Sequence, residues 1–149
     1  MIPDFDENGN LPPGVYFCDW SEFKENFGYT PARARMIRGM EAAMTDLKDA
    51  GCRNFFINGS FVTSEPNPND FDACWEPDAV DMDYLRQNHP TLLNFTNKRA
   101  AQKAKYKGEL FRTDQIVNDE GTTSLDFFLL DRQNNRKGII AIDLLRWEP

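Results

Sequence analysis

Residues 57–75, INGSFVTSEPNPNDFDACW, are the most informative part of the chain for its fold. An apolar run ends in Gly59 and Ser60, a proline-containing loop follows, and a second apolar run begins with Asp70 and Asp72. Side chains two residues apart on a strand share one face, so the two aspartates are brought together. Like charges this close repel, and a proton or a cation relieves the repulsion. The stretch therefore predicts either a metal site beside a phosphate-binding turn or an acidic surface loop.

Helices and strands can be assigned around this stretch from caps and periodicity. Thr30 is expected to cap a long helix, with Pro31 at its first position and Gly51 just past its end. Residues 1–20 are expected to be extended. Apolar side chains at helical spacing predict the core face of the long helix: Met36, Ile37, Met40, Met44 and Leu47. Predicted helices span 21–27, 31–50, 78–86 and 92–106, and predicted strands span 53–58 and 70–75.

The C-terminal part predicts a β-hairpin made of residues 122–131 and 137–145. A two-residue loop at Asn134-Asn135 would place Asp126 directly opposite Asp143, on the same face. Together with the preceding elements, this predicts an α/β (α+β) fold, with a small mixed sheet and helices packed on it. The length of 149 residues fits a single domain, 1–149.

Composition excludes several classes of function. The net charge of −7 argues against sequence-blind binding of long DNA. No run is long and apolar enough to span a bilayer, and the acidic start lacks the order of a signal peptide. The three cysteines show no CxxC spacing, which indicates reduced thiols in a cytoplasmic protein. The single histidine, His89, lies before Pro90 in a predicted loop and is not expected to be catalytic.

Charge is distributed unevenly along the chain. Residues 54–85 contain seven acidic residues and no lysine or arginine, whereas 98–108 contain five basic residues and no acid. An acidic patch and a basic patch in one small domain suit a substrate that brings both metal ions and phosphates. The alternative is that the two patches are only solvent-exposed faces of the domain and bind no substrate. Lys103, in the basic cluster, is the candidate phosphate contact.

The order of these motifs has a chemical rationale. A Gly-Ser turn offers backbone N–H groups and a hydroxyl to phosphate oxygens. An Asp-x-Asp strand beside it supplies the hard oxygen ligands that Mg²⁺ prefers. A third carboxylate would complete a site for in-line displacement at phosphorus. Asp126, flanked by apolar residues in its predicted strand, is the favoured third carboxylate, and Asp143 is the runner-up.

These residues resemble a known family. INGS followed by DFD is similar to the Gly-Ser … Asp-x-Asp signature of the nucleotidyltransferase fold, the superfamily of DNA polymerase β. The blocks LPPG, RAAQKAKYKGELF, TTSLDFF and KGIIAIDL further resemble a short bacterial family assigned to that fold. The resemblance implies that Gly59 and Ser60 hold the triphosphate and that Asp70 and Asp72 bind Mg²⁺ or Mn²⁺. It gives Asp126 the role of third ligand and proton acceptor.

Two functions follow as expectations. The first is Mg²⁺-dependent transfer of a nucleotidyl group from an NTP to a hydroxyl of a protein or RNA acceptor, with the acidic balance favouring protein. The second is a non-catalytic nucleotide- or partner-binding protein of the same fold, such as the antitoxin-like component of a toxin–antitoxin or phage-defence system.

Overall fold

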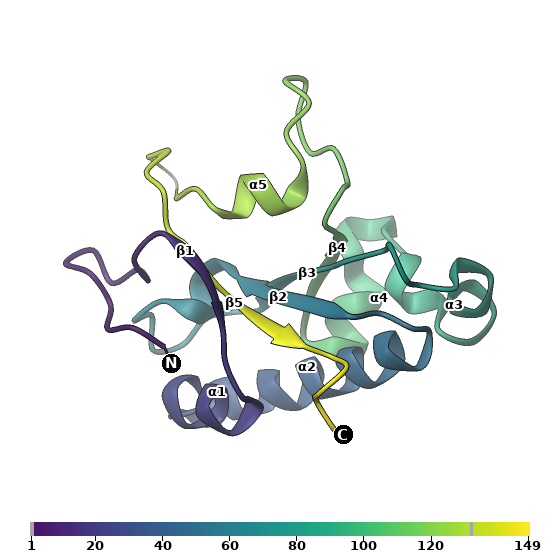
Figure 1. Ribbon diagram of the computed structural model, residues 1–149, viewed down its shortest axis with the longest axis horizontal. Coiled ribbons are helices and arrows are strands. Elements are labelled where there is room, and N and C mark those ends of the chain that lie inside the picture. The colour runs from purple at the N-terminus through teal and green to yellow at the C-terminus, as the bar shows by residue number, and fades with distance from the viewer. Residues whose placement is uncertain (1, 132) are drawn as a thin grey trace.

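The computed structural model describes residues 2–131 and 133–149 (Figure 1). Among these residues, strands β1 to β5 form one mixed sheet in the order β1-β5-β2-β3-β4. The strands are β1 (Gly14–Phe17), β2 (Asn54–Asn58), β3 (Phe71–Trp75), β4 (Gly108–Arg112) and β5 (Gly138–Asp143). The helices are α1 (Trp20–Phe27), α2 (Pro31–Asp49), α3 (Met82–Asn88), α4 (Thr96–Tyr106) and α5 (Ser124–Phe128), with short 3₁₀ turns η1 (Gly59–Val62) and η2 (Pro90–Leu93). The predicted fold class, a mixed sheet with helices packed on it, is confirmed.

Strand β2 determines where the candidate residues lie. It runs antiparallel to β5 on one side and to β3 on the other. Its first residue, Asn54, pairs with Asp143, and its last residue, Asn58, pairs with Asp72. Strand β4 is parallel to β3, and a parallel pair needs a long crossover, which α3, η2 and α4 supply.

Helix α2 covers one face of the sheet and forms the main core. Thr30 caps it as predicted, because its hydroxyl accepts a hydrogen bond from the Arg33 amide at 3.1 Å. The predicted apolar stripe is buried at every position: Met36, Ile37, Met40, Met44 and Leu47. Helix α5 lies on the other face, where Leu125 and Phe128 pack over Phe56 and Cys74 (Figure 1).

The predicted C-terminal hairpin is wrong. Residues 124–128 form helix α5 rather than a strand, and β5 pairs with β1 and β2 instead. The reason is local: Thr123 caps the helix by accepting a hydrogen bond from the amide of Asp126 at 3.3 Å. Thr123-x-x-Asp126 has the spacing of a capping box, and this favours a helix start over a strand. An isolated bridge between Leu130 and Arg136 is the hairpin-like contact formed in this region.

Two further expectations concern cysteines and membranes. Cys52 and Cys74 are buried and Cys18 is partly buried, and all three are free, as predicted. None of the helices in the described ranges is long and apolar enough to cross a membrane.

Candidate metal centre

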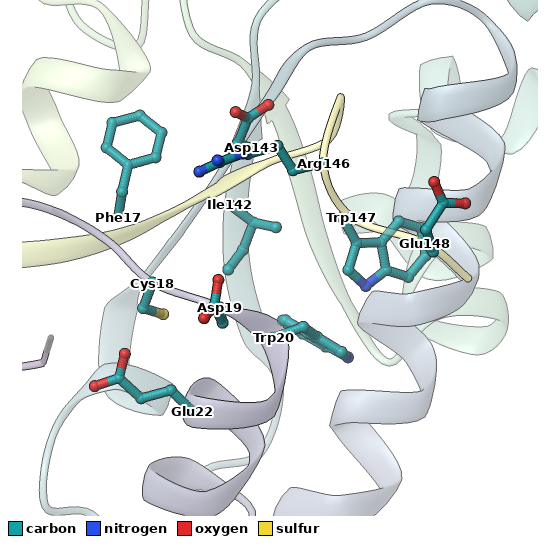
Figure 2. Close-up of a pocket in the computed structure, with 10 residues that line it drawn as sticks. All are labelled: Phe17, Cys18, Asp19, Trp20, Glu22, Ile142, Asp143, Arg146, Trp147 and Glu148. Carbon is teal, nitrogen blue, oxygen red and sulfur yellow. The ribbon is translucent and has the colours of Figure 1, made fainter.

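The two ends of β2 carry different sets of acidic side chains. At its start, Asp143 lines a cavity of about 550 Å³ together with Trp20, Arg146 and Trp147 (Figure 2). The Asp143 carboxylate accepts a hydrogen bond from the Leu145 amide at 3.0 Å. Because β2 is extended, this end is separated from Asp72 by the length of a five-residue strand, roughly 13 Å.

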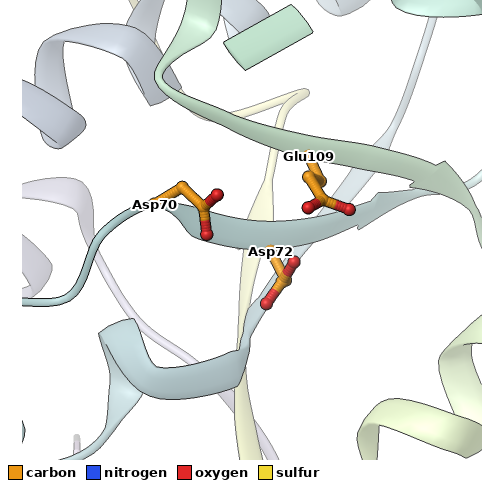
Figure 3. Close-up of side chains that lie close together, drawn as sticks. All are labelled: Asp70, Asp72 and Glu109. Carbon is orange, nitrogen blue, oxygen red and sulfur yellow. The ribbon is translucent and has the colours of Figure 1, made fainter. Parts of the chain in front are cut away.

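At the end of β2, three carboxylates converge: Asp70, Asp72 and Glu109 (Figure 3). One ligand oxygen from each lies within 4.8 Å of the others. Asp72 and Glu109 are register partners in the parallel pair β3–β4, and Asp70 precedes Asp72 by two residues. The predicted approach of Asp70 and Asp72 is therefore confirmed. These three side chains are called the acidic cluster below.

Burial and mutual repulsion disfavour full ionisation of the acidic cluster. The pKa of Asp72 is raised from 3.8 to about 7, first by burial and then by the charges of Glu109 and Asp70. Lys137 and Lys103 act against this rise. The pKa of Asp70 is also raised, by burial and then by Glu109. Three acids in this arrangement attract a cation, because a cation compensates both the burial of the carboxylates and their mutual repulsion.

The residues around the acidic cluster fit a hard divalent cation. The Lys103 ammonium lies 3.3 Å from Glu109 Oε1 and 4.0 Å from Asp70 Oδ2, so a positive charge already stands between two of the acids. Asn58, the register partner of Asp72, is fully buried, and its Oδ1 has no hydrogen-bond partner in the described part of the chain. Carboxylate and amide oxygens are the donors that Mg²⁺ and Ca²⁺ accept.

The Gly-Ser turn packs directly against the acidic cluster. Gly59 has φ +73°, a conformation that L side chains rarely adopt, and a Cβ there would lie 2.5 Å from Asp72 Oδ2. Only glycine therefore lets the backbone approach this carboxylate. Ser60 follows at the start of η1 with an exposed side chain.

Arg33 holds the loop that follows the turn, and sequence reasoning missed it. Its side chain is fully buried and donates to the carbonyls of Phe61 at 2.7 Å, Thr63 at 3.0 Å and Glu65 at 3.1 Å. The signal was present in the sequence, since Arg33 precedes Met36 by three residues and so lies on the apolar face of α2.

Helix α4 fixes the position of Glu109 by holding the outer edge of β4. The Arg99 guanidinium donates to the Leu110 carbonyl at 2.7 Å and stacks on the Phe95 and Phe111 rings at 4.3 and 3.9 Å. The amide of Leu110 donates to Gln102 Oε1 at 2.9 Å. With these backbone groups satisfied, the residue before Leu110 is held firmly beside Asp72.

Residues 3–143 match the model of a family described as Family of unknown function (DUF6932). The chain belongs to this family. The matched range contains the turn and the whole acidic cluster. No curated protein and no solved structure matches this DUF6932 chain.

In this DUF6932 chain the acid that joins Asp70 and Asp72 in the acidic cluster is Glu109, rather than Asp126 or Asp143. Asp126 lies exposed on α5 and is not part of the acidic cluster, because the segment forms a capped helix instead of the predicted strand. Asp143 lies at the far end of β2. The sequence did not reveal Glu109 because its short strand, GELFR, directly follows a basic helix. The available indication was an acidic residue between Gly108 and the apolar pair Leu110-Phe111.

Proposed function

We propose that the acidic cluster is the centre of a nucleotidyl-transfer site, in which Asp70, Asp72 and Glu109 hold Mg²⁺ or Mn²⁺. The observation that carries the proposal is the contact between Gly59 and Asp72, which places a Gly-Ser turn against the three carboxylates. A phosphate-binding turn and a cation site side by side suit the triphosphate of an NTP.

In this proposal each residue has a defined task. The Ser60 hydroxyl and the turn amides orient the phosphates, and Arg33 keeps the turn rigid by holding the loop behind it. A bound divalent cation would neutralise the phosphate charge. The acceptor oxygen attacks the α-phosphorus, the bond to the bridging oxygen breaks, and pyrophosphate leaves. Glu109 takes the proton of the acceptor hydroxyl, the task that the resemblance gave to Asp126. Three free cysteines favour a cytoplasmic setting for this reaction.

A label-transfer assay tests the proposal. The protein is incubated with each α-labelled nucleoside triphosphate, Mg²⁺ or Mn²⁺ and a cell lysate, and the products are separated into RNA and protein. Label is expected on one of them with the native chain and with Asp126→Asn. No label is expected with Asp72→Asn or Glu109→Gln. Equal labelling by all four proteins would contradict the assignment of the acidic cluster.

A second candidate is nucleotide or partner binding without turnover. The observation that favours it is the segment after Ser60, because Phe61 and Val62 are buried and residues 61–69 contain no lysine or arginine to grip a phosphate. The same assay separates the two functions. Bound nucleotide with no label on any acceptor would favour binding alone.

A further inference from the structure

A cavity of about 180 Å³ opens beside the acidic cluster, between the start of α2 and the end of α4. Its polar lining consists of Arg35, Lys103, Lys107, Asn69 and Asp70. Three cations and one carboxylate thus surround a space that adjoins the proposed metal site. A cavity with this charge balance suits an anion.

Two of the cations are available to a ligand. Arg35 forms no hydrogen bond or ion pair with any residue that the structure describes, and its side chain is exposed at the rim. The Lys107 ammonium donates to the Ala104 carbonyl at 3.1 Å, within its own helix. Lys103 links the cavity to the acidic cluster through Glu109 and Asp70. The cavity therefore offers two positive charges, those of Arg35 and Lys107, that no acidic side chain in the described part of the chain neutralises.

The backbone that carries these cations is unusual. Lys107 ends α4 with φ +66°, a left-handed conformation in which glycine is the common residue. A lysine there costs about 1 kcal/mol or more relative to a relaxed conformation. Gly39 lets α2 touch the end of α4, since a Cβ at this position would overlap the Tyr106 carbonyl. The close approach of the two helices at Gly39 brings Arg35 and Lys107 into the lining of one cavity.

The acidic cluster has two distinct neighbours. Gly59 of the turn lies against Asp72, whereas Lys103 of the cavity lies against Asp70 and Glu109. The proposed function assigns the NTP phosphates to the turn. In an in-line displacement the attacking oxygen and the leaving oxygen lie on opposite sides of the phosphorus. No residue of the turn lines the cavity, which adjoins the acidic cluster at Asp70, so we assign the acceptor to the cavity and the NTP phosphates to the turn.

We propose that the cavity lined by Arg35, Lys103 and Lys107 binds a phosphate of the acceptor, and that the acceptor is the 3′ end of an oligonucleotide. This inference rests on the proposed function. A protein hydroxyl, which the acidic composition favours, brings no phosphate to fill such a cavity. The contact is local, so it is compatible with a net charge of −7 that disfavours long nucleic acid.

Equilibrium binding without turnover tests the proposal. A 5′-fluorescein RNA trinucleotide with a free 3′ hydroxyl is titrated with the protein in Mg²⁺, and its anisotropy gives the Kd. Arg35→Gln and Lys107→Gly should each weaken this binding roughly tenfold, the value of one charge-assisted hydrogen bond. Lys107→Gly also relieves the left-handed backbone, so its melting temperature should stay level or rise. A loss of binding in this variant cannot then be ascribed to unfolding.

Matched controls and a second ligand complete the test. Arg38→Gln on α2 and Lys98→Gln on α4 remove exposed cations that do not line the cavity, and both should bind the trinucleotide like the native chain. A fluorescent ATP analogue should bind every variant equally. An equal loss of ATP affinity in Arg35→Gln and Lys107→Gly would assign the cavity to the NTP and overturn the inference.

Two more outcomes overturn the inference while leaving the proposed function intact. One is unchanged trinucleotide binding in both cavity variants. The other is a native protein that labels a protein acceptor and does not bind the trinucleotide. Failure of the proposed function has a different signature, because it shows as an absence of label on any acceptor and does not depend on trinucleotide affinity.

Discussion

Replacing Asp72 with asparagine should stabilise the metal-free protein. The carboxyl of Asp72 has a pKa of about 7 in the fold against 3.8 for an unperturbed aspartate, because it is partly buried and lies beside the charges of Glu109 and Asp70. At about 1.4 kcal/mol per pH unit, this difference corresponds to roughly 4 kcal/mol at neutral pH. Asparagine has nearly the same shape and no charge to bury. Asp72→Asn should therefore raise the free energy of unfolding by up to about 4 kcal/mol at pH 7 and above.

The raised pKa of Asp72 also predicts how the free energy of unfolding changes with pH. A pKa that is higher in the folded than in the unfolded protein means that the folded protein binds the proton more tightly. The contribution of Asp72 to stability is therefore fully present below pH 3.8 and is lost as the pH rises to about 7 and beyond. The difference between Asp72→Asn and the native chain should open across this window.

Denaturant unfolding in EDTA at pH 5, 6, 7 and 8, followed by circular dichroism, measures the difference. In a chain of this size each kcal/mol corresponds to roughly 2–4 °C in melting temperature, so thermal melts should show it as well. Added Mg²⁺ should raise the melting temperature of the native chain, because a ligand that binds only the folded state stabilises it, and should not change that of Asp72→Asn.

Two results would contradict this prediction. If Asp72→Asn is no more stable than the native chain in EDTA at pH 8, the ionised Asp72 carboxylate does not destabilise the metal-free fold. If Mg²⁺ raises both melting temperatures equally, the cation does not bind at Asp72. Asp126→Asn is the matched control, because its carboxylate is exposed on α5 and should change neither measurement.

Three further predictions concern the residues around Asp72. Glu109→Gln should abolish both the Mg²⁺-induced rise in melting temperature and label transfer, whereas Asp126→Asn should retain both; the reverse pattern would restore Asp126 as the third ligand. Gly59→Ala should lower the free energy of unfolding by about 1–3 kcal/mol in denaturant titrations, because φ +73° is strained for alanine and its Cβ would press on Asp72. Unchanged stability would show that the turn does not pack against this carboxylate. Arg33→Met should cost about 3 kcal/mol or more by the same measurement, because it leaves the buried carbonyl of Phe61 and the loop carbonyls of Thr63 and Glu65 without their donor. A loss below about 1 kcal/mol would mean that the loop is held by other contacts.

Features that depend on residues close together in the chain could be predicted from the sequence. Thr30 and Pro31 start α2 because a cap and a fixed φ act within one turn of helix. The burial of the apolar stripe of α2 could be predicted because helical periodicity alone places its side chains on one face. Asp70 and Asp72 meet because they are two residues apart in the extended chain at the start of β3, where side-chain direction alternates. The strand predicted around Asp126 was wrong for a local reason, because the capping signal at Thr123 prevailed over the strand-like apolar residues.

Which distant side chains join these local features depends on how the helices and strands pack. Glu109 completes the acidic cluster only through the parallel register of β3 and β4, which the α3–η2–α4 crossover sets. Asp143 lies outside the acidic cluster because β2 runs antiparallel to both its neighbours. This pairing places Asp143 beside the first residue of β2 and Asp72 beside the last. Arg35 reaches the cavity because Gly39 allows α2 and α4 to touch. Such contacts depend on the packing of elements distant in the chain, and no short-range pattern specifies that packing.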